Sequence, residues 1–137
     1  MISITCEKKR IQTFLKQMKE ILYADAFNID RDFVFQMKRS RDDANDDCTN
    51  QATVNALGYT RHDIVEELKG LELSHYSESV IDDVVVDSFL HIFVKEIAGR
   101  QVYIKIRLKR RTERPGEYVY CISFHFARYK ISHFPFR

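Results

Sequence analysis

Two segments in the last third of the chain alternate apolar with polar or charged residues. Gln101–Lys109 places Val, Ile, Ile and Leu at even positions and Tyr, Lys, Arg and Lys at odd ones. Cys121–Phe126 repeats the alternation and includes His125. Because side chains of a β-strand alternate between its two faces, both segments are predicted to be strands. One face would then belong to a core, and the other would suit a polyanionic ligand.

These residue types match the needs of RNA cleavage without a metal ion. A base must deprotonate the ribose 2′-hydroxyl, an acid must protonate the leaving 5′-oxygen, and cations must stabilise the phosphorane. Imidazole titrates closest to neutral pH, so His125 and His91 are the candidate acid–base pair, and Tyr103 can orient the scissile nucleotide. The candidate residues for phosphate binding and base stacking are Lys95, Lys105, Arg107, Lys109 and Phe93. Neither a metal nor a cofactor is predicted.

The same pattern also fits proteins without catalytic activity. A single histidine or tyrosine on a strand is more often a surface or packing residue, and charge runs usually serve solubility. The alternative function is therefore a non-catalytic RNA-binding or protein-interaction module that uses the same basic face. A third candidate is a structural phage or plasmid protein whose basic strand contacts an acidic partner.

Charge is unevenly distributed along a chain of 137 residues whose net charge is only +2. Residues 95–114 contain eight basic and two acidic residues, and no acidic residue follows Cys121. The length predicts one domain over residues 1–137. The spacing of the three cysteines (Cys6, Cys48, Cys121) does not fit a zinc site, and no segment resembles a leader or a membrane span. We therefore expect a reduced, cytoplasmic protein.

Helices and further strands are expected around these segments. Apolar residues at helical spacing predict a helix near Thr5–Ala24, and another is expected over Thr49–Ala56. Thr60 and Asp63 form a capping-box pattern that begins a third helix. The other expected elements are a strand within Asn28–Lys38, loops over Ser40–Asn50 and Ser74–Asp83, strands over Val84–Ile97, Gln101–Lys109 and Glu117–Phe126, and an aromatic tail over Ile131–Arg137. This order predicts an α+β fold with an antiparallel sheet and helices packed on one face.

The first hairpin decides which residues share a face. A three-residue loop over Ile97–Gly99 would pair Phe93 with Tyr103 and His91 with Lys105. His91 and Phe93 would then lie on the cationic face. A two-residue turn would shift the pairing and place an isoleucine opposite Lys105, which burial disfavours.

The hairpin around Pro115–Gly116 fixes the register of the last strand less tightly. If Leu108 pairs with Phe124 on the core side, Arg107 and His125 become neighbours on the cationic face.

Short motifs within residues 53–137 resemble MqsR-type toxins of toxin–antitoxin systems. These motifs are Leu57–Thr60, Gly70–Leu71, Tyr76–Ser77, Gly99–Ile106, Cys121–Tyr129 and Phe134–Phe136. The resemblance implies a RelE-like fold and an mRNA endoribonuclease, or mRNA interferase, that needs no metal. It also implies silencing by a co-expressed antitoxin protein.

The resemblance further implies roles for individual residues. Tyr103 matches the active-site tyrosine of a Gln-Val-Tyr motif, and His125 stands where the family has a lysine after Ser-Phe. A family glutamine falls at Leu90 or His91, with His91 favoured because of its parity. A family lysine falls within Ser77–Glu78, so its role is lost or moved here. These departures leave the cleavage mechanism and the base preference open, and they indicate a histidine-based variant of an enzyme that the resemblance implies acts on mRNA.

Overall fold

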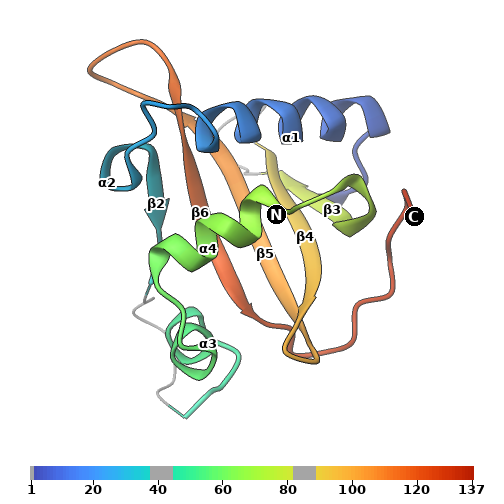
Figure 1. The fold of residues 1–137 in the computed structure, drawn as a ribbon. Coiled ribbons are helices and arrows are strands. Elements are labelled where there is room, and N and C mark those ends of the chain that lie inside the picture. Colours follow the sequence, from blue (N-terminus) through green and yellow to red (C-terminus); the bar gives the residue numbers. More distant parts are fainter. Residues whose placement is uncertain (1, 38–44, 82–88) are drawn as a thin grey trace.

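The described residues form one sheet of six strands in the order β1-β3-β4-β5-β6-β2 (Figure 1). The structure is a computed structural model that describes residues 2–37, 45–81 and 89–137. The strands are β1 (Ile2–Ile4), β2 (Phe33–Phe35), β3 (Tyr76–Ile81), β4 (Phe89–Ile97), β5 (Arg100–Arg110) and β6 (Glu117–Phe126). The helices are α1 (Lys8–Leu22), α2 (Ile29–Asp32), α3 (Asn50–Leu57) and α4 (Arg61–Lys69), with a 3-10 turn, η1, at Leu73–His75.

The α+β class is confirmed, but the sheet is mixed. Four of the strand pairs are antiparallel, whereas β2 runs parallel to β6, with Phe33 opposite Val119. A parallel pair requires a long connection between its strands. Here α3, α4 and three strands separate β2 from β6 in sequence, so the expectation of a wholly antiparallel sheet is wrong at this edge.

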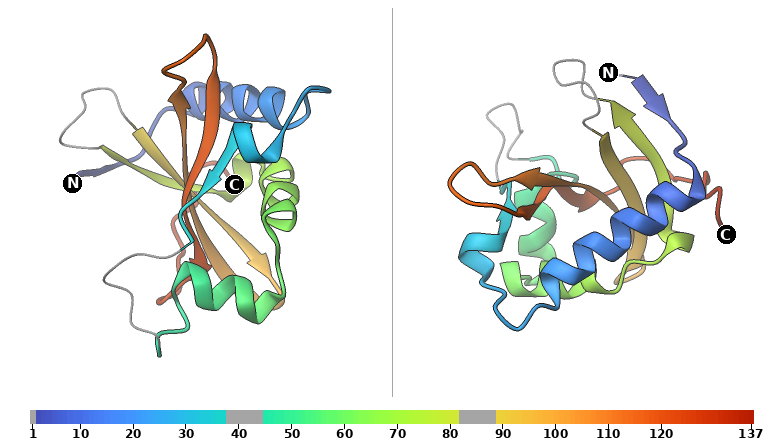
Figure 2. Two further views of the ribbon diagram at one scale, coloured as in Figure 1. Left: turned by 90° about the vertical axis from the view of Figure 1, so that its left-hand side faces the viewer. Right: turned by 90° about the horizontal axis from the view of Figure 1, so that it is seen from above.

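Helices α1 and α4 cover one face of the sheet (Figures 1 and 2). α1 buries a stripe at helical spacing, which includes Ile11, Phe14 and Met18. These side chains and Leu68 of α4 pack in one cluster with Ile104 of β5. Each large apolar side chain buried in this way contributes roughly 1.5–3 kcal/mol. The expected helices over Thr5–Ala24 and from Thr60 onward are confirmed, the latter with both hydrogen bonds of its capping box.

Helix α3 completes the edge of β6 that β2 does not reach. The Asn50 amide donates to the carbonyl of Ile122 at 2.8 Å and accepts from the backbone N–H of Phe124 at 2.9 Å. Thr53 Oγ1 accepts from the N–H of Phe126 at 2.9 Å. Side chains of a helix therefore take the place of a neighbouring strand and leave no unpaired edge for association along this part of β6.

The hairpin between β4 and β5 has a two-residue turn, so the expected three-residue loop is wrong. Ala98 and Gly99 both have positive φ, 52° and 79°, as the tight hairpin turn requires. Ile97 pairs with Arg100, and Ile92 pairs with Lys105. Burial does not disfavour this register, because β4 is apolar at both parities and both of its faces are buried. Alternation within β4 therefore carried no information about its register.

The segment 74–83, expected to be a loop, is largely a strand. Residues 76–81 form β3, which pairs with both β1 and β4. Its polar residues misled the interpretation, because Ser77 and Ser79 are buried. Residues 38–44 and 82–88 lie outside the described residues, and with them parts of the expected segments Asn28–Lys38, Ser40–Asn50 and Val84–Ile97.

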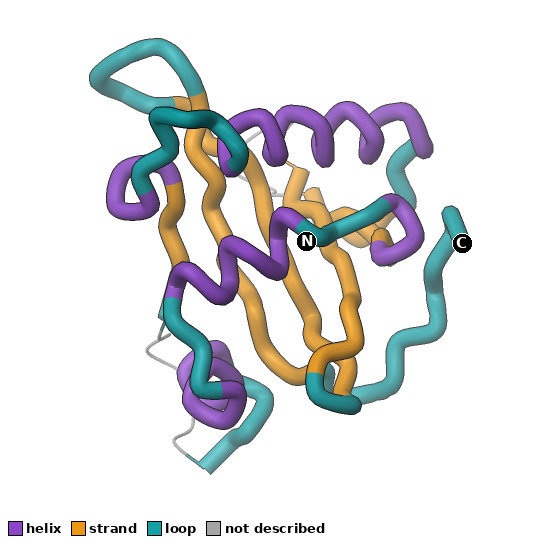
Figure 3. Tube along the Cα trace, viewed as in Figure 1, coloured by secondary structure: helices purple, strands orange, loops and turns teal. Residues whose placement is uncertain are grey.

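The C-terminal tail is an extended loop that folds back along the molecule (Figure 3). The Gln101 side chain holds its start, because it bonds both the carbonyl and the N–H of Ile131 at 2.8 Å. Near its end, the ring of Phe136 stacks on Tyr76 with centroids 5.6 Å apart. The tail thereby covers one side of the buried Tyr76.

Candidate active site

Tyr103 and His125 lie directly opposite each other on β5 and β6. Their rings stack with centroids 5.1 Å apart and an interplanar angle of 16°. Both side chains are half-buried, so neither is sealed in the core. They project from the sheet face opposite α1 and α4, because their neighbours Val102 and Ile104 face the helices. The prediction that Tyr103 and His125 share one face is confirmed.

Lys105 brings a cation to this pair. Its Nζ lies 5.9 Å from the centroid of the Tyr103 ring, and Lys105 pairs across the strands with Ser123. A β-bulge follows directly, between Lys105 and Ile106, and shifts the register of β6. The Tyr103 phenol thus has an imidazole stacked on it and an ammonium group nearby. We call Tyr103, Lys105 and His125 the stacked triad.

An apolar cluster packs against the Tyr103 side chain of the triad. Val80, Leu90 and Ile92 form a small buried cluster on this face, and Tyr103 and Ile122 pack against it. This packing fixes the Tyr103 ring while leaving part of it exposed. The face is therefore amphipathic, with apolar support under polar and charged groups, and does not consist of charge alone.

Lys109 extends the cationic row along β5. Its Nζ lies 4.4 Å from the ring centroid of Tyr120, an attractive cation–π distance. Its backbone pairs with Tyr118. Alternating cations and aromatic rings suit a single-stranded nucleic acid, since rings stack on bases and cations meet phosphates.

Three predicted site residues lie on the opposite face, and their placement beside Tyr103 is wrong. His91 is 5% exposed and packs edge-on against Phe14 of α1, with ring centroids 4.5 Å apart. Phe93 is fully buried. Lys95 binds Glu67 of α4 at 3.3 Å instead of facing the solvent side of the sheet. The cause is the two-residue turn, which moves the odd positions of β4 to the helical face.

Arg107 also departs from the expected arrangement. Leu108 pairs with Val119 and not with Phe124, so Arg107 lies opposite Tyr120 and away from His125. The proposed proximity of Arg107 and His125 is therefore wrong. The Arg107 side chain lines a groove beside α1, and its Nε is buried without a hydrogen-bond partner among the described residues.

A buried chain of hydrogen bonds ends at His91. The Tyr76 hydroxyl accepts from the N–H of Cys6 at 3.1 Å and lies 2.6 Å from Ser79 Oγ, which lies 2.7 Å from His91 Nδ1. Burial, with a smaller contribution from Arg10, lowers the pKa of His91 to about 4. His91 is therefore neutral near pH 7. Sequence reasoning missed Ser79 and left Tyr76 unassigned, because the strand that carries them was expected to be a loop.

The segment Asp46–Cys48 lies beside His125. A hydrogen bond from Arg128 lowers the pKa of Asp46, with a smaller contribution from His125. Asp46, Asp47 and Cys48 each bring one ligand atom within 4.8 Å of the others. Both carboxylates are already ion-paired, Asp46 with Arg128 and Asp47 with Arg100. We assign this cluster a structural role.

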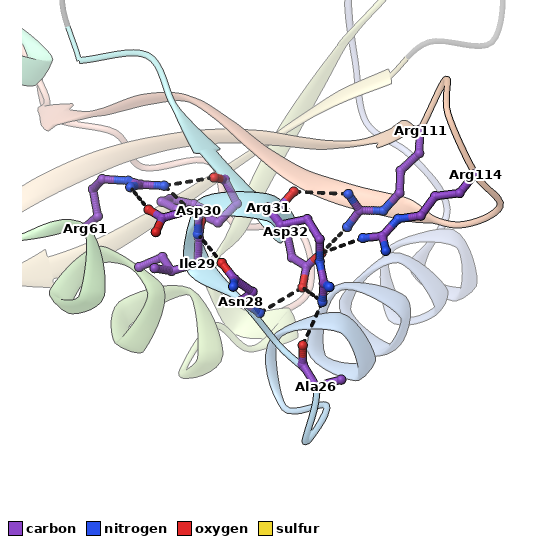
Figure 4. A network of polar contacts seen from close by, with 10 residues as sticks. Ala26, Asn28, Ile29, Asp30, Arg31, Asp32, Arg61, Arg111 and Arg114 are labelled. Carbon is purple, nitrogen blue, oxygen red and sulfur yellow. Dashed lines mark hydrogen bonds and ion pairs between the residues drawn. The ribbon is translucent and has the colours of Figure 1, made fainter.

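The tip of the β5–β6 hairpin is anchored to α2 by a cluster of arginines around Asp32 (Figure 4). Asp32 accepts from Arg31 at 2.9 Å and from Arg111, and Arg114 lies at 3.8 Å. The hydrogen bond from Arg31 is the largest cause that lowers the pKa of Asp32 to about 2. Part of the basic run of the sequence thus serves the fold.

No family model, curated protein or solved structure matches this chain. The geometry defines a protein class no finer than an α+β domain with an aromatic and cationic sheet face. Within the described parts of the chain, each helix is too short or too polar to cross a bilayer.

Proposed function

We propose that the protein is a metal-independent endoribonuclease and that the stacked triad is its active site. The observation that carries the proposal is the stack of Tyr103 on His125 at 5.1 Å, with the Lys105 ammonium 5.9 Å from the same ring. An imidazole, a phenol and an ammonium group in one partly exposed cluster provide a base, an acid and a cation. RNA cleavage without metal requires these three functions.

The chemistry follows from these three groups. His125 accepts the proton of the ribose 2′-hydroxyl while the 2′-oxygen attacks phosphorus. The bond from phosphorus to the 5′-oxygen breaks, and the Tyr103 phenol donates a proton to that oxygen. Lys105 stabilises the charge on the non-bridging phosphate oxygens. The products are a 2′,3′-cyclic phosphate and a 5′-hydroxyl, and solvent returns the proton from His125 to Tyr103.

This assignment differs from the expectation of two cooperating histidines. His91 lies on the opposite face beneath α1 and cannot reach a substrate bound at His125. Tyr103 is a proton donor whose ring stacks on His125, so we give it the role of the acid. Lys109, with Tyr120, is placed to bind the strand beyond the scissile phosphate.

We propose the biological setting from the resemblance to MqsR-type toxins. The substrate would be mRNA in the cytoplasm, the fold RelE-like, and the regulator a co-expressed antitoxin that covers the triad. Phosphate contacts by Lys105 and Lys109 should make RNA affinity fall steeply as salt is added.

The test is to incubate the full chain with a defined RNA in EDTA and to measure cleavage and binding separately. We expect His125→Ala and Tyr103→Phe each to slow cleavage by about 10²–10⁴-fold while RNA still binds. The matched controls are His62→Ala and Tyr23→Phe, both at exposed positions, the latter at the end of α1, which should cleave normally. Binding by the wild-type chain without any cleavage would support the RNA-binding module instead.

A further inference from the structure

A second group of polar residues surrounds a groove on the helical side of the sheet, between α1, the start of β4 and the end of β5. The groove has a volume of about 560 Å³, within the usual range of small-molecule sites. Its apolar lining comes from Phe14, Phe89 and Leu108. Its charged lining consists of three cations and two acids, Lys9, Arg10, Arg107, Glu7 and Glu117, so the lining carries a net charge of +1.

His91 lines the groove and ends the buried chain of hydrogen bonds that begins at Tyr76. The Tyr76 hydroxyl accepts the N–H of Cys6 and also shares a hydrogen bond with Ser79 Oγ, in which either oxygen can be the donor. Ser79 Oγ is hydrogen-bonded in turn to His91 Nδ1, which accepts or donates according to the tautomer of the ring. In the tautomer in which Nδ1 accepts from Ser79, the ring proton of neutral His91 resides on Nε2. Nε2 has no hydrogen-bond partner among the described residues, although His91 lines the groove.

Arg107 supplies a second donor to the lining of the same groove. The ladder between β4 and β5 ends at the pair His91–Ile106, and beyond it Arg107 lines the groove with Leu108. Its Nε is buried and lacks a partner within the described residues. An unpaired buried donor on a charged group costs about 1–3 kcal/mol or more, so a bound acceptor would recover this cost.

The charged groups of the groove are not neutralised by one another. In the described parts of the chain, neither Arg107 nor Arg10 is ion-paired with Glu7 or Glu117, whose side chains are exposed. The guanidinium of Arg10 lies over the Phe89 ring, 3.8 Å from its centroid. This contact holds a cation beside the groove without using its hydrogen-bond donors.

We propose that His91 carries its proton on Nε2 and that this groove binds a phosphate monoester, held by this Nε2–H and by the guanidinium of Arg107. Lys9 and Arg10 add positive charge on the α1 side. His91 acts there as a hydrogen-bond donor and not as a base, because its pKa of about 4 keeps it neutral and unreactive toward protons at pH 7. The site is a binding site and does not depend on the ribonuclease proposal, since the groove is lined by α1 and by none of the stacked triad.

The test uses the full chain and three probes: inorganic phosphate, adenosine 5′-monophosphate and adenosine. Binding is followed by calorimetry and by the ring ¹⁵N signals of His91 in NMR spectra. We expect both phosphate-containing probes to shift the Nε2 signal and adenosine to leave it unchanged. Tighter binding of the nucleotide than of phosphate would show that the apolar lining contributes. Equal binding would assign the site to the phosphate group alone.

Two matched substitutions decide whether the groove is responsible. Arg107→Gln should weaken phosphate binding by at least about tenfold, because it removes a charged hydrogen-bond donor. Arg110→Gln removes an exposed cation from the same strand outside the groove and should leave the affinity unchanged. Three results would overturn the proposal: no Nε2 shift in the wild-type chain at millimolar phosphate, equal losses in both variants, or binding of adenosine as tight as that of the nucleotide. None of these measurements uses RNA cleavage, so the two proposals fail separately.

Discussion

Replacing Asp32 with asparagine removes the negative charge that ties the β5–β6 hairpin to α2. The Asp32 side chain is 8% exposed, and Arg31, Arg111 and Arg114 surround it. Its carboxylate also accepts from the N–H of Asn28 at 2.9 Å. Asparagine has nearly the same shape, so the substitution isolates the charge from the packing.

The pKa of Asp32 gives the size of the effect. Its fall from 3.8 to about 2 means that the folded protein favours the ionised form. At about 1.36 kcal/mol for each pKa unit, the ionised carboxylate contributes about 2.5 kcal/mol to stability at neutral pH. Asp32→Asn should therefore lower the free energy of unfolding by about 2–3 kcal/mol.

The lowered pKa of Asp32 also determines how the stability of the protein changes with pH. Because the folded pKa is below the unfolded one, the stabilisation is complete above pH 3.8 and is lost as the pH falls through 3.8 toward 2. The stability difference between the wild-type chain and Asp32→Asn should shrink over the same range. Urea denaturation at neutral pH and at several acidic pH values measures both quantities.

Asp30→Asn is the matched control. Asp30 lies two residues away, is 81% exposed and binds only Arg61 among the described cations, at 2.8 Å. An exposed pair of this kind contributes about 0–1 kcal/mol. The reasoning would be refuted if both variants lost the same stability, or if Asp32→Asn differed from the wild-type chain by the same amount at pH 2 and pH 7.

Three further substitutions test the fold and the buried chain of hydrogen bonds. Asn50→Ala leaves backbone groups of β6 unpaired and should cost about 2–3 kcal/mol in urea denaturation, with the partly exposed Gln51→Ala near zero. Ala98→Asn relieves a positive φ of 52° and should raise the free energy of unfolding by about 0.5–1 kcal/mol; a loss would contradict the assigned turn. Ser79→Ala removes the hydrogen-bond partner of His91 Nδ1 and should mix the two ring tautomers in ¹⁵N NMR spectra; an unchanged Nε2–H form would contradict the proposed role of Ser79 in holding the proton on Nε2.

The sequence predicted best where one face of an element is buried and the other is not. The alternation of β5 located the strand and its core face, since Val102, Ile104 and Ile106 are fully buried. The amphipathic stripe of α1 and the Thr60 capping box were equally informative. In these elements the local pattern and the tertiary environment agree, which is why the pattern suffices.

The prediction failed where packing decides between patterns that are locally equivalent. Both parities of β4 are apolar, so the turn at Ala98–Gly99 set the register and moved His91 away from Tyr103. Polar residues such as Ser79 concealed β3, because their hydrogen bonds inside the fold satisfy them. The parallel pairing of β2 and the role of Asn50 depend on contacts between distant segments.

The ends that cleavage leaves on RNA test the ribonuclease proposal most directly. The full chain should be incubated in EDTA with an RNA oligonucleotide, and with the same oligonucleotide carrying 2′-deoxyribose at the cleaved position. The arrangement of His125, Tyr103 and Lys105 predicts a 2′,3′-cyclic phosphate and a 5′-hydroxyl from the RNA, and no cut at the deoxy position. Absence of cleavage, 5′-phosphate ends, or cleavage at the deoxy position would contradict it.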